Sequence, residues 1–230
     1  MCNEFQRRNK FLIACYSNNI EEVKTLELPD FKFLNNVLID MCGVGLLNIA
    51  KYIYNHEDRK DYDDEITYDD AVIESCKNGQ LHILQWLLDI PLTYTHSFTR
   101  AFTTTCEYGH LHIAQLLYNQ DEDIIRFAPD AFIEACKNGH LNIAKWLIDN
   151  HYKSSGFIHF KSYSNFKVEI KELLIGANLV HPRQLNTADL EHYLTYTDGL
   201  VPADFNHPNT RKRGQHTKPA PKYFFFEFDI

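Results

Sequence analysis

The chain has 230 residues, of which 44% are hydrophobic, and its 31 acidic and 23 basic residues give a net charge of −8 at pH 7. This hydrophobic content is sufficient for a packed core, whereas the acidic balance argues against a general nucleic-acid-binding protein. The N-terminal residues lack the apolar stretch of a secretory signal, and no apolar run approaches the roughly 18 residues of a membrane helix, so we expect an intracellular, cytoplasmic protein without a membrane partner.

One sequence pattern recurs along most of the chain. It is clearest in residues 130–150, DAFIEACKNGHLNIAKWLIDN, and it occurs again at 100–120 and at 69–90. Cys76, Cys106 and Cys136 take the same place in these segments and lie 30 residues apart. Self-similarity at a fixed period indicates a repeat solenoid, in which each unit buries its apolar surface against its neighbours.

Three further segments fit the pattern more weakly and bring the predicted number of units to six. Residues 11–26 and 37–54 fit with Cys15 and Cys42 in the cysteine position, and residues 158–175 fit with Tyr163 there. The first and last units are the most eroded, as is typical of end repeats that face water on one side.

Each unit is predicted to form two short helices. In the fifth unit Pro129 and Asp130 begin the first helix, because an Asp side chain can accept the amide protons of a first turn. The other units hold Asn9, Asn36, Asp70 and Arg100 at the position of Asp130. Since an Arg side chain has no acceptor, we expect Ser97 or Thr99 to cap the fourth unit.

The turn and the second helix follow directly. Gly139 is predicted to end the first helix, since glycine adopts the left-handed conformation at least cost, and the equivalent residues are Gly45, Gly79 and Gly109. In the second helix one apolar face holds Leu141, Ala144, Leu147 and Ile148, and another holds Ile143 and Trp146. A helix with two apolar faces needs partners on two sides, which neighbouring units supply.

The frame Ala-Cys-x-Asn-Gly-His-Leu-x-Ile-Ala-x-Trp-Leu resembles the helix-turn-helix body of the ankyrin repeat over roughly residues 9–175. Its Gly-His-Leu turn starts at Gly109 and at Gly139, with the variant Gly-Gln-Leu at Gly79. The Thr-Pro-Leu-His opening of the common ankyrin repeat is absent and the period is shorter than the usual value of about 33 residues, so we expect reduced β-hairpin loops. This variant is similar to divergent ankyrin proteins of large DNA viruses of amoebae and of some protists, which would place it in the cytoplasm or nucleus of a host cell.

The resemblance implies an all-α repeat solenoid over residues 1–178, with residues 179–230 forming a C-terminal helix, a basic linker and an aromatic tail. It also implies a non-enzymatic scaffold that binds another protein through the concave side of the first helices. The ends of these helices differ from unit to unit, and the candidate partner-binding residues are Tyr16, Lys77, Glu107, Tyr108 and Lys137. Aromatic anchors dominate protein interfaces, which favours the two tyrosines.

Cysteine positions support an intracellular protein. Cys15, Cys42, Cys76, Cys106 and Cys136 share one position of successive units, where helices about 8–10 Å apart are too distant for a disulfide that needs Cα atoms within roughly 7 Å. We therefore expect five reduced, buried thiols, and we expect Cys2 to be an accessible thiol at the chain end.

No constellation of residues in the sequence predicts catalysis, and we expect neither a cofactor nor a small-molecule ligand. The nearest approach to a metal site is Cys106, His110 and His112, but Gly109 interrupts the helix between them and His110 recurs in the repeat as His140. A histidine in this turn is more typical of a hydrogen bond to the backbone. The acidic residues 56–70 lack the glycine and terminal Glu of an EF-hand, which favours a solvated loop over a calcium site.

The C-terminal segment departs from the repeat. Residues 187–195 are predicted to form a short helix capped by Thr187, and residues 202–222 form a basic linker. The aromatic tail, residues 223–230, is predicted either to fold back on the last repeat or to dock onto a partner. In the second case the chain would be an adaptor that recruits host machinery such as a ubiquitin ligase, although no F-box-like leucine pattern is present in residues 180–230.

Overall fold

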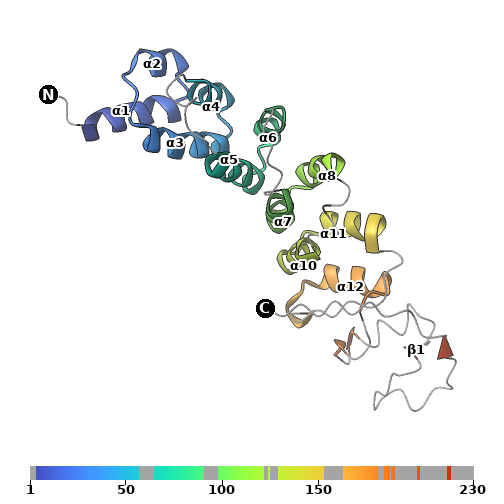
Figure 1. Cartoon of the computed structure of the whole chain (residues 1–230). Coiled ribbons are helices and arrows are strands. Elements are labelled where there is room, and N and C mark those ends of the chain that lie inside the picture. Colours follow the sequence, from blue (N-terminus) through green and yellow to red (C-terminus); the bar gives the residue numbers. More distant parts are fainter. Residues whose placement is uncertain are drawn as a thin grey trace. The chain divides into compact units, whose positions relative to one another are not determined.

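The computed structural model of the chain describes residues 4–56, 65–90, 98–121, 124, 129–152, 163–180, 184–186, 188–189, 201–202 and 217–218. The chain divides into two compact units, Met1–Ala128 and Pro129–Ile230, and each is described by itself. Apart from one pair of two-residue strands, the regular structure of the described residues is helical (Figure 1). This confirms the predicted all-α, ankyrin-type helix-turn-helix repeat.

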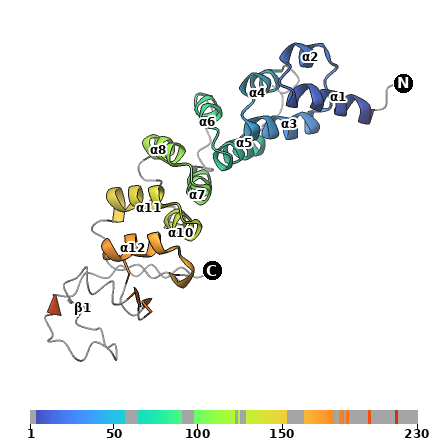
Figure 2. The same ribbon diagram turned by 180° about the vertical axis from the view of Figure 1, so that it is seen from behind.

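The described residues of the first compact unit, Met1–Ala128, form four pairs of helices. They are α1 (Glu4–Tyr16) with α2 (Ile20–Thr25), α3 (Phe31–Val44) with α4 (Leu47–Tyr54), α5 (Glu65–Lys77) with α6 (Leu81–Leu88), and α7 (Phe98–Tyr108) with α8 (Leu111–Gln120). The first helices pack on one another in the order α1, α3, α5, α7, and the second helices follow on the other side of the stack (Figures 1 and 2). Each unit of the repeat therefore buries its apolar faces against the next.

The second unit contains the fifth pair and part of the sixth. Helix α10 (Pro129–Asn138) is followed by α11 (Leu141–Leu147), which continues into a π-helical turn, η2 (Ile148–Tyr152). A 3-10 turn, η3 (Tyr163–Asn165), precedes α12 (Val168–Gly176), and α12 packs on α11. Farther along, β1 (Val201–Pro202) pairs in parallel with β2 (Thr217–Lys218).

The helix starts differ from the prediction. Only α10 begins at the expected proline, while Asn9, Asn36, Asp70, Thr99 and Arg100 lie inside their helices. The first helices extend farther upstream because the extra turn buries further side chains: Leu34 is buried in α3, and buried Tyr68 donates its hydroxyl proton to the Leu87 carbonyl oxygen at 3.0 Å. In α3 the cap is Asp30, whose side chain accepts the Phe33 amide proton at 3.2 Å. Ser97 lies outside the described residues.

The predicted helix ends are confirmed. The left-handed backbone conformation occurs at Gly45, Gly79, Gly109 and Gly139, with φ between 74° and 90°. Asn18 takes this conformation at the same position of the first unit, with φ of 54°, because Asn tolerates it better than most residues. After each of these residues the chain turns directly into the second helix.

The core contains the predicted cysteines. Cys15, Cys42, Cys76, Cys106 and Cys136 are free and buried, as predicted, and Cys2 lies outside the described residues. Burial raises the pKa of the Cys15 and Cys136 thiols to about 12 and that of Cys76 to about 11. One helical turn before the cysteine, a phenylalanine is fully buried in three of the first helices: Phe11, Phe102 and Phe132. The second helices contribute Ile143, Ala144 and Leu147, while Trp146 is half-buried.

Beyond α12, the described residues continue the apolar core of the second unit. Leu179, Val180 and Leu185 are buried. The Asn186 side chain accepts the Asp189 amide proton at 2.9 Å, so a helical turn starts one residue before the predicted cap at Thr187. The rest of the predicted 187–195 helix, most of the basic linker and the aromatic tail lie outside the described residues.

Candidate protein-binding surface

Three positions at the end of each first helix share one face of that helix, and they are exposed or half-buried except at Gly43, which is buried. They lie two residues before, one after and two after the repeat cysteine, and this spacing of three and four places them on one helix face. We call this set the first-helix ridge. In the first compact unit it comprises Ile13, Tyr16, Ser17, Asp40, Gly43, Val44, Glu74, Lys77, Asn78, Thr104, Glu107 and Tyr108. In the second compact unit it comprises Glu134, Lys137 and Asn138.

All five candidate partner-binding residues lie on this ridge. Tyr16 at the end of α1 is 52% exposed, and Tyr108 at the end of α7 is 44% exposed. Glu107 precedes Tyr108 and is also exposed. Lys77 is half-buried at the end of α5, and Lys137 is exposed in α10. The structure thus places four of the five candidates on the ridge of the first unit and the fifth in the second unit.

The two lysines are held by their own helices. Lys77 Nζ lies 3.3 Å from Glu74 Oε1, and Lys137 Nζ lies 2.7 Å from Glu134 Oε1. The following asparagine also repeats its contact, because Asn78 donates to the Glu74 carbonyl oxygen at 2.9 Å and its counterpart in α10 donates to the Glu134 carbonyl oxygen at 3.0 Å. Such exposed pairs contribute at most about 1 kcal/mol, so they organise the surface more than they stabilise the fold.

Helix α3 departs from this arrangement. Asp40 replaces the Glu, and Gly43 replaces the Lys that would neutralise it. The Tyr16 hydroxyl, from the neighbouring α1, donates to Asp40 Oδ2 at 3.2 Å. Partial burial and the Asp40 carboxylate both raise the pKa of Tyr16, burial being the larger cause. Sequence analysis missed Asp40, although a comparison with Glu74-x-x-Lys77 position by position would have found it.

Exposed apolar side chains accompany this carboxylate. Ile13, one turn before Tyr16, is 69% exposed, and Val44, one turn after Asp40, is 51% exposed. Both were absent from the predicted set because neither matches the charged or aromatic residues expected at a binding surface. The ridge on α1 and α3 is therefore apolar around a single carboxylate, whereas the ridge on α5 carries an internal ion pair.

The histidine considered as a metal ligand, His110, forms a hydrogen bond to the backbone at the turn between two helices. His110 Nε2 lies 3.0 Å from the Lys77 carbonyl oxygen of the preceding unit, and a carbonyl can only accept, so this nitrogen carries the proton. This confirms the predicted hydrogen bond to the backbone. A Cβ on Gly79 would lie 2.7 Å from His110 Cε1, so glycine is required here for space as well as for its φ of 74°.

Other units use different residues for the same contact. His82 Nε2 lies 3.0 Å from the Gly45 carbonyl oxygen, and Lys167 Nζ lies 3.4 Å from the Asn138 carbonyl oxygen. Within the residues that the structure describes, no three His, Cys, Asp or Glu side chains are grouped as metal ligands would be. Cys106 itself is buried in the core of α7.

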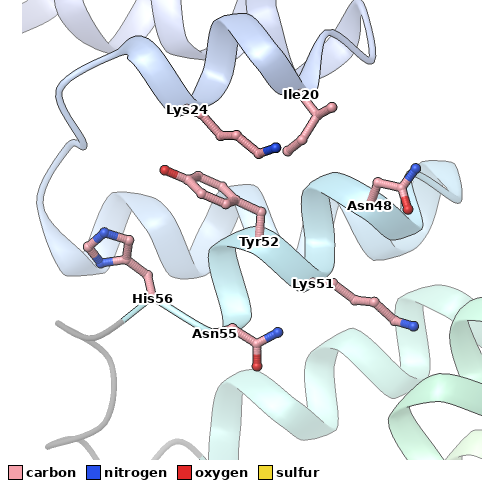
Figure 3. Close-up of a pocket in the computed structure, with 7 residues that line it drawn as sticks. All are labelled: Ile20, Lys24, Asn48, Lys51, Tyr52, Asn55 and His56. Carbon is pink, nitrogen blue, oxygen red and sulfur yellow. The ribbon is translucent and has the colours of Figure 1, made fainter.

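An open groove of about 520 Å³ lies between the second helices α2 and α4. Its lining consists of Ile20, Lys24, Asn48, Lys51, Tyr52, Asn55 and His56 (Figure 3). Lys24 reaches from α2 toward Tyr52 but lies 2.8 Å from Glu21 Oε1, and Lys51 extends away from Tyr52 to lie 5.8 Å from the centre of the Trp86 ring (Figure 3). Both cations are therefore engaged within the protein.

Comparison with protein families gives one match. Residues 72–156, which run from α5 to beyond α11, match the family model described as ankyrin repeats, in three copies. Residues 72–156 are therefore similar to ankyrin repeats. The ankyrin turn geometry continues outside the matched region, at Gly45 and Asn18, and ankyrin repeats indicate a protein–protein interaction domain. Neither the curated proteins nor the solved structures that were compared gave a match.

The described part of the chain contains no helix with the length and apolar character needed to cross a membrane. The similarity to viral and protist ankyrin proteins stays a prediction, as does the boundary at residues 178/179.

Proposed function

We propose that this chain is a non-enzymatic scaffold that binds another protein through the first-helix ridge, the side expected to be concave. One observation carries the proposal: among the described residues, four of the six exposed large hydrophobic side chains lie on this ridge. They are Ile13, Tyr16, Val44 and Tyr108. Burying such a side chain against a partner contributes roughly 1.5–3 kcal/mol, whereas leaving it in water gains nothing.

The surroundings of Tyr108 support its role as an anchor. It follows Glu107 at the end of α7, while the core beneath it is fixed by buried Phe102 and Cys106. Aromatic side chains on a rigid backbone lose little conformational freedom on binding, which is why they dominate interface energies. Glu107 and Lys77, in the same compact unit, would then lie at the polar rim and influence association rate more than affinity, and Lys137 would do so at the ridge of the second compact unit.

The proposed setting is a reducing compartment such as the cytoplasm. Five buried thiols are free, and the protein carries a net charge of −8. Disulfides are rare in reducing compartments, and buried free cysteines pack there as small apolar residues. The adaptor hypothesis concerns residues 179–230, most of which lie outside the described residues, so it stays a prediction.

Site-specific crosslinking tests the proposal. A photoreactive amino acid at position 108 is expected to crosslink a protein in cell lysate, while the same group at Gln85, an exposed position of α6, is expected to give no specific product. Equal crosslinking from both positions, or crosslinking from position 85 alone, would show that the ridge is not the binding surface. The full-length chain is used in both cases, and its melting temperature confirms folding.

A further inference from the structure

The ridge of the first unit contains one carboxylate that lacks the cation its equivalents have. Glu74 lies 3.3 Å from Lys77, three residues later, and Glu134 lies 2.7 Å from Lys137, again three residues later. In α3 the same spacing gives Asp40 and Gly43, so the helix supplies no cation. Within the part of the chain that the structure describes, Asp40 accepts a hydrogen bond from the Tyr16 hydroxyl and has no ion pair.

This carboxylate lies among exposed apolar side chains. Tyr16 reaches Asp40 from α1 at 3.2 Å, Ile13 lies one turn before Tyr16 on the same helix, and Val44 lies one turn after Asp40 on α3. We call these four residues the Asp40 patch. A hydroxyl group satisfies one lone pair of a carboxylate but leaves its charge uncompensated, so covering the patch with apolar groups alone would strand a charge.

We propose that the Asp40 patch recognises a segment of the partner protein in which a Lys or Arg side chain is flanked by apolar side chains. The inference rests on the proposed function and specifies the chemistry of the partner at one part of the ridge. The cation would pair with Asp40 in the place where Lys77 and Lys137 pair with their glutamates. The flanking groups would cover Ile13, Tyr16 and Val44, and excluding water would strengthen the ion pair.

The charge of the whole protein favours the same partner. A net charge of −8 attracts basic segments and repels acidic ones, which raises the association rate at low salt. At Glu74 and Glu134 the lysines at 77 and 137 already neutralise the carboxylates, so these two positions offer no uncompensated charge to a basic segment. The preference should therefore depend on Asp40 and not on the ridge in general.

Fluorescence polarisation with matched synthetic peptides tests the inference. Four labelled peptides of equal length are compared. Three of them carry Arg, Gln or Glu between a Leu and a Phe, and the fourth carries Arg between two Ser residues. The full-length chain is expected to bind the first most tightly. Asp40→Asn should weaken that binding by about two- to five-fold, the range for one exposed ion pair. Asp40→Lys should invert the preference between the Arg and Glu peptides.

Three further variants provide controls. Glu169→Gln removes an exposed carboxylate of α12 in the second unit and should leave peptide binding unchanged. Gly43→Lys supplies the missing intrahelical cation and should reduce the preference for Arg, while Gly43→Ala should retain it. Both Gly43 variants place a Cβ close to Glu74 Cγ, at 2.9 Å, so the comparison between them controls for this added Cβ.

The outcomes separate this inference from the proposed function. If Asp40→Asn and Asp40→Lys leave the ratio of Arg to Glu peptide binding unchanged, or if no peptide class binds, the inference is overturned. Position 108 would still crosslink a partner in that case if the proposed function holds. If neither the peptides nor the crosslinking report binding at the ridge, both are wrong.

Discussion

The ends of α3 and α5 are neighbours built on one repeat frame, yet they present different surfaces. Their buried sides match, since Leu38 and Cys42 in α3 correspond to Val72 and Cys76 in α5. Their outer sides do not match. In α5 the carboxylate of Glu74 forms an ion pair with Lys77, whereas in α3 the carboxylate of Asp40 lies beside exposed apolar side chains. The buried positions thus fix the stacking, and three outer positions per unit can change the surface without disturbing the core.

The largest expected effect separates the buried frame from the ridge. Leu147→Ala removes a side chain that is 1% exposed in α11, and it should lower the free energy of unfolding by about 2–5 kcal/mol. Lys137→Ala, on the ridge of α10, should change it by no more than about 0.5 kcal/mol, because its ion pair is exposed. Urea denaturation of both variants provides the measurement. Similar midpoint shifts would mean that the helix faces are wrongly assigned.

Two glycines sharpen the same comparison. Gly79→Ala forces an alanine into a left-handed conformation and against the His110 ring, so the free energy of unfolding should fall by about 1–3 kcal/mol. Gly43→Ala in α3 meets the side chains of Glu74 and Asn78, and alanine is the better helix former by about 1 kcal/mol, so its net effect should be smaller. Chemical denaturation that ranks the two variants in the opposite order would contradict this account of the turn.

The C-terminal tail tests whether the last repeat differs from the central ones. If residues 223–230 fold back on it, deleting them should lower the melting temperature by about 2–4 °C per kcal/mol lost and increase the binding of a hydrophobic dye. The reason is that apolar surface is returned to water. Unchanged stability together with loss of partner capture would identify the tail as a docking peptide instead.

The effect that is smallest at neutral pH concerns the buried thiols. Burial raises the pKa of Cys15 and Cys136 to about 12 and that of Cys76 to about 11, from 9.0. Above pH 9 the unfolded chain loses these protons while the folded chain retains them, so stability should be unaffected below pH 9 and should fall as the pH rises toward 12. Thermal melts across this range provide the measurement.

At neutral pH a thiol reagent should label Cys2 quickly and the five repeat cysteines only after denaturation.

Fast labelling of three or more thiols in the native protein would contradict the burial of the cysteines. A rise in stability above pH 9 would contradict the sign of the thiol effect, because a raised folded-state pKa can only disfavour folding there.

The sequence predicted those features that repeat in register. Gly79, Gly109 and Gly139 predicted the left-handed turns, and the five cysteines marked the core, because each recurs at a fixed place in the frame. The helix starts were predicted wrongly because they lie upstream of that frame. Asp30 caps α3, and buried Leu34 in α3 and buried Tyr68 in α5 share one position eight residues before the cysteine, where the side chains differ more between helices than they do in the frame.

The candidate surface was predicted only in part. Tyr16 and Tyr108 were found as aromatic residues at varying positions, and both are exposed. Asp40 was missed because its importance depends on two other residues. The absence of a lysine at position 43 becomes significant only by comparison with Glu74 and Lys77, and the contact with Tyr16 from the neighbouring repeat is visible only in the structure.

The central claim is that the first-helix ridge binds a partner protein. The most direct measurement uses a partner that was identified by crosslinking and then purified in free form, and it compares the affinity of this partner for ridge variants. Tyr16→Ala combined with Tyr108→Ala should weaken binding by at least about ten-fold, because aromatic anchors carry most of the energy of an interface. Gln85→Ala, on the exposed side of α6, should leave the affinity unchanged. An unchanged affinity for the double tyrosine variant, with its melting temperature intact, would contradict the account.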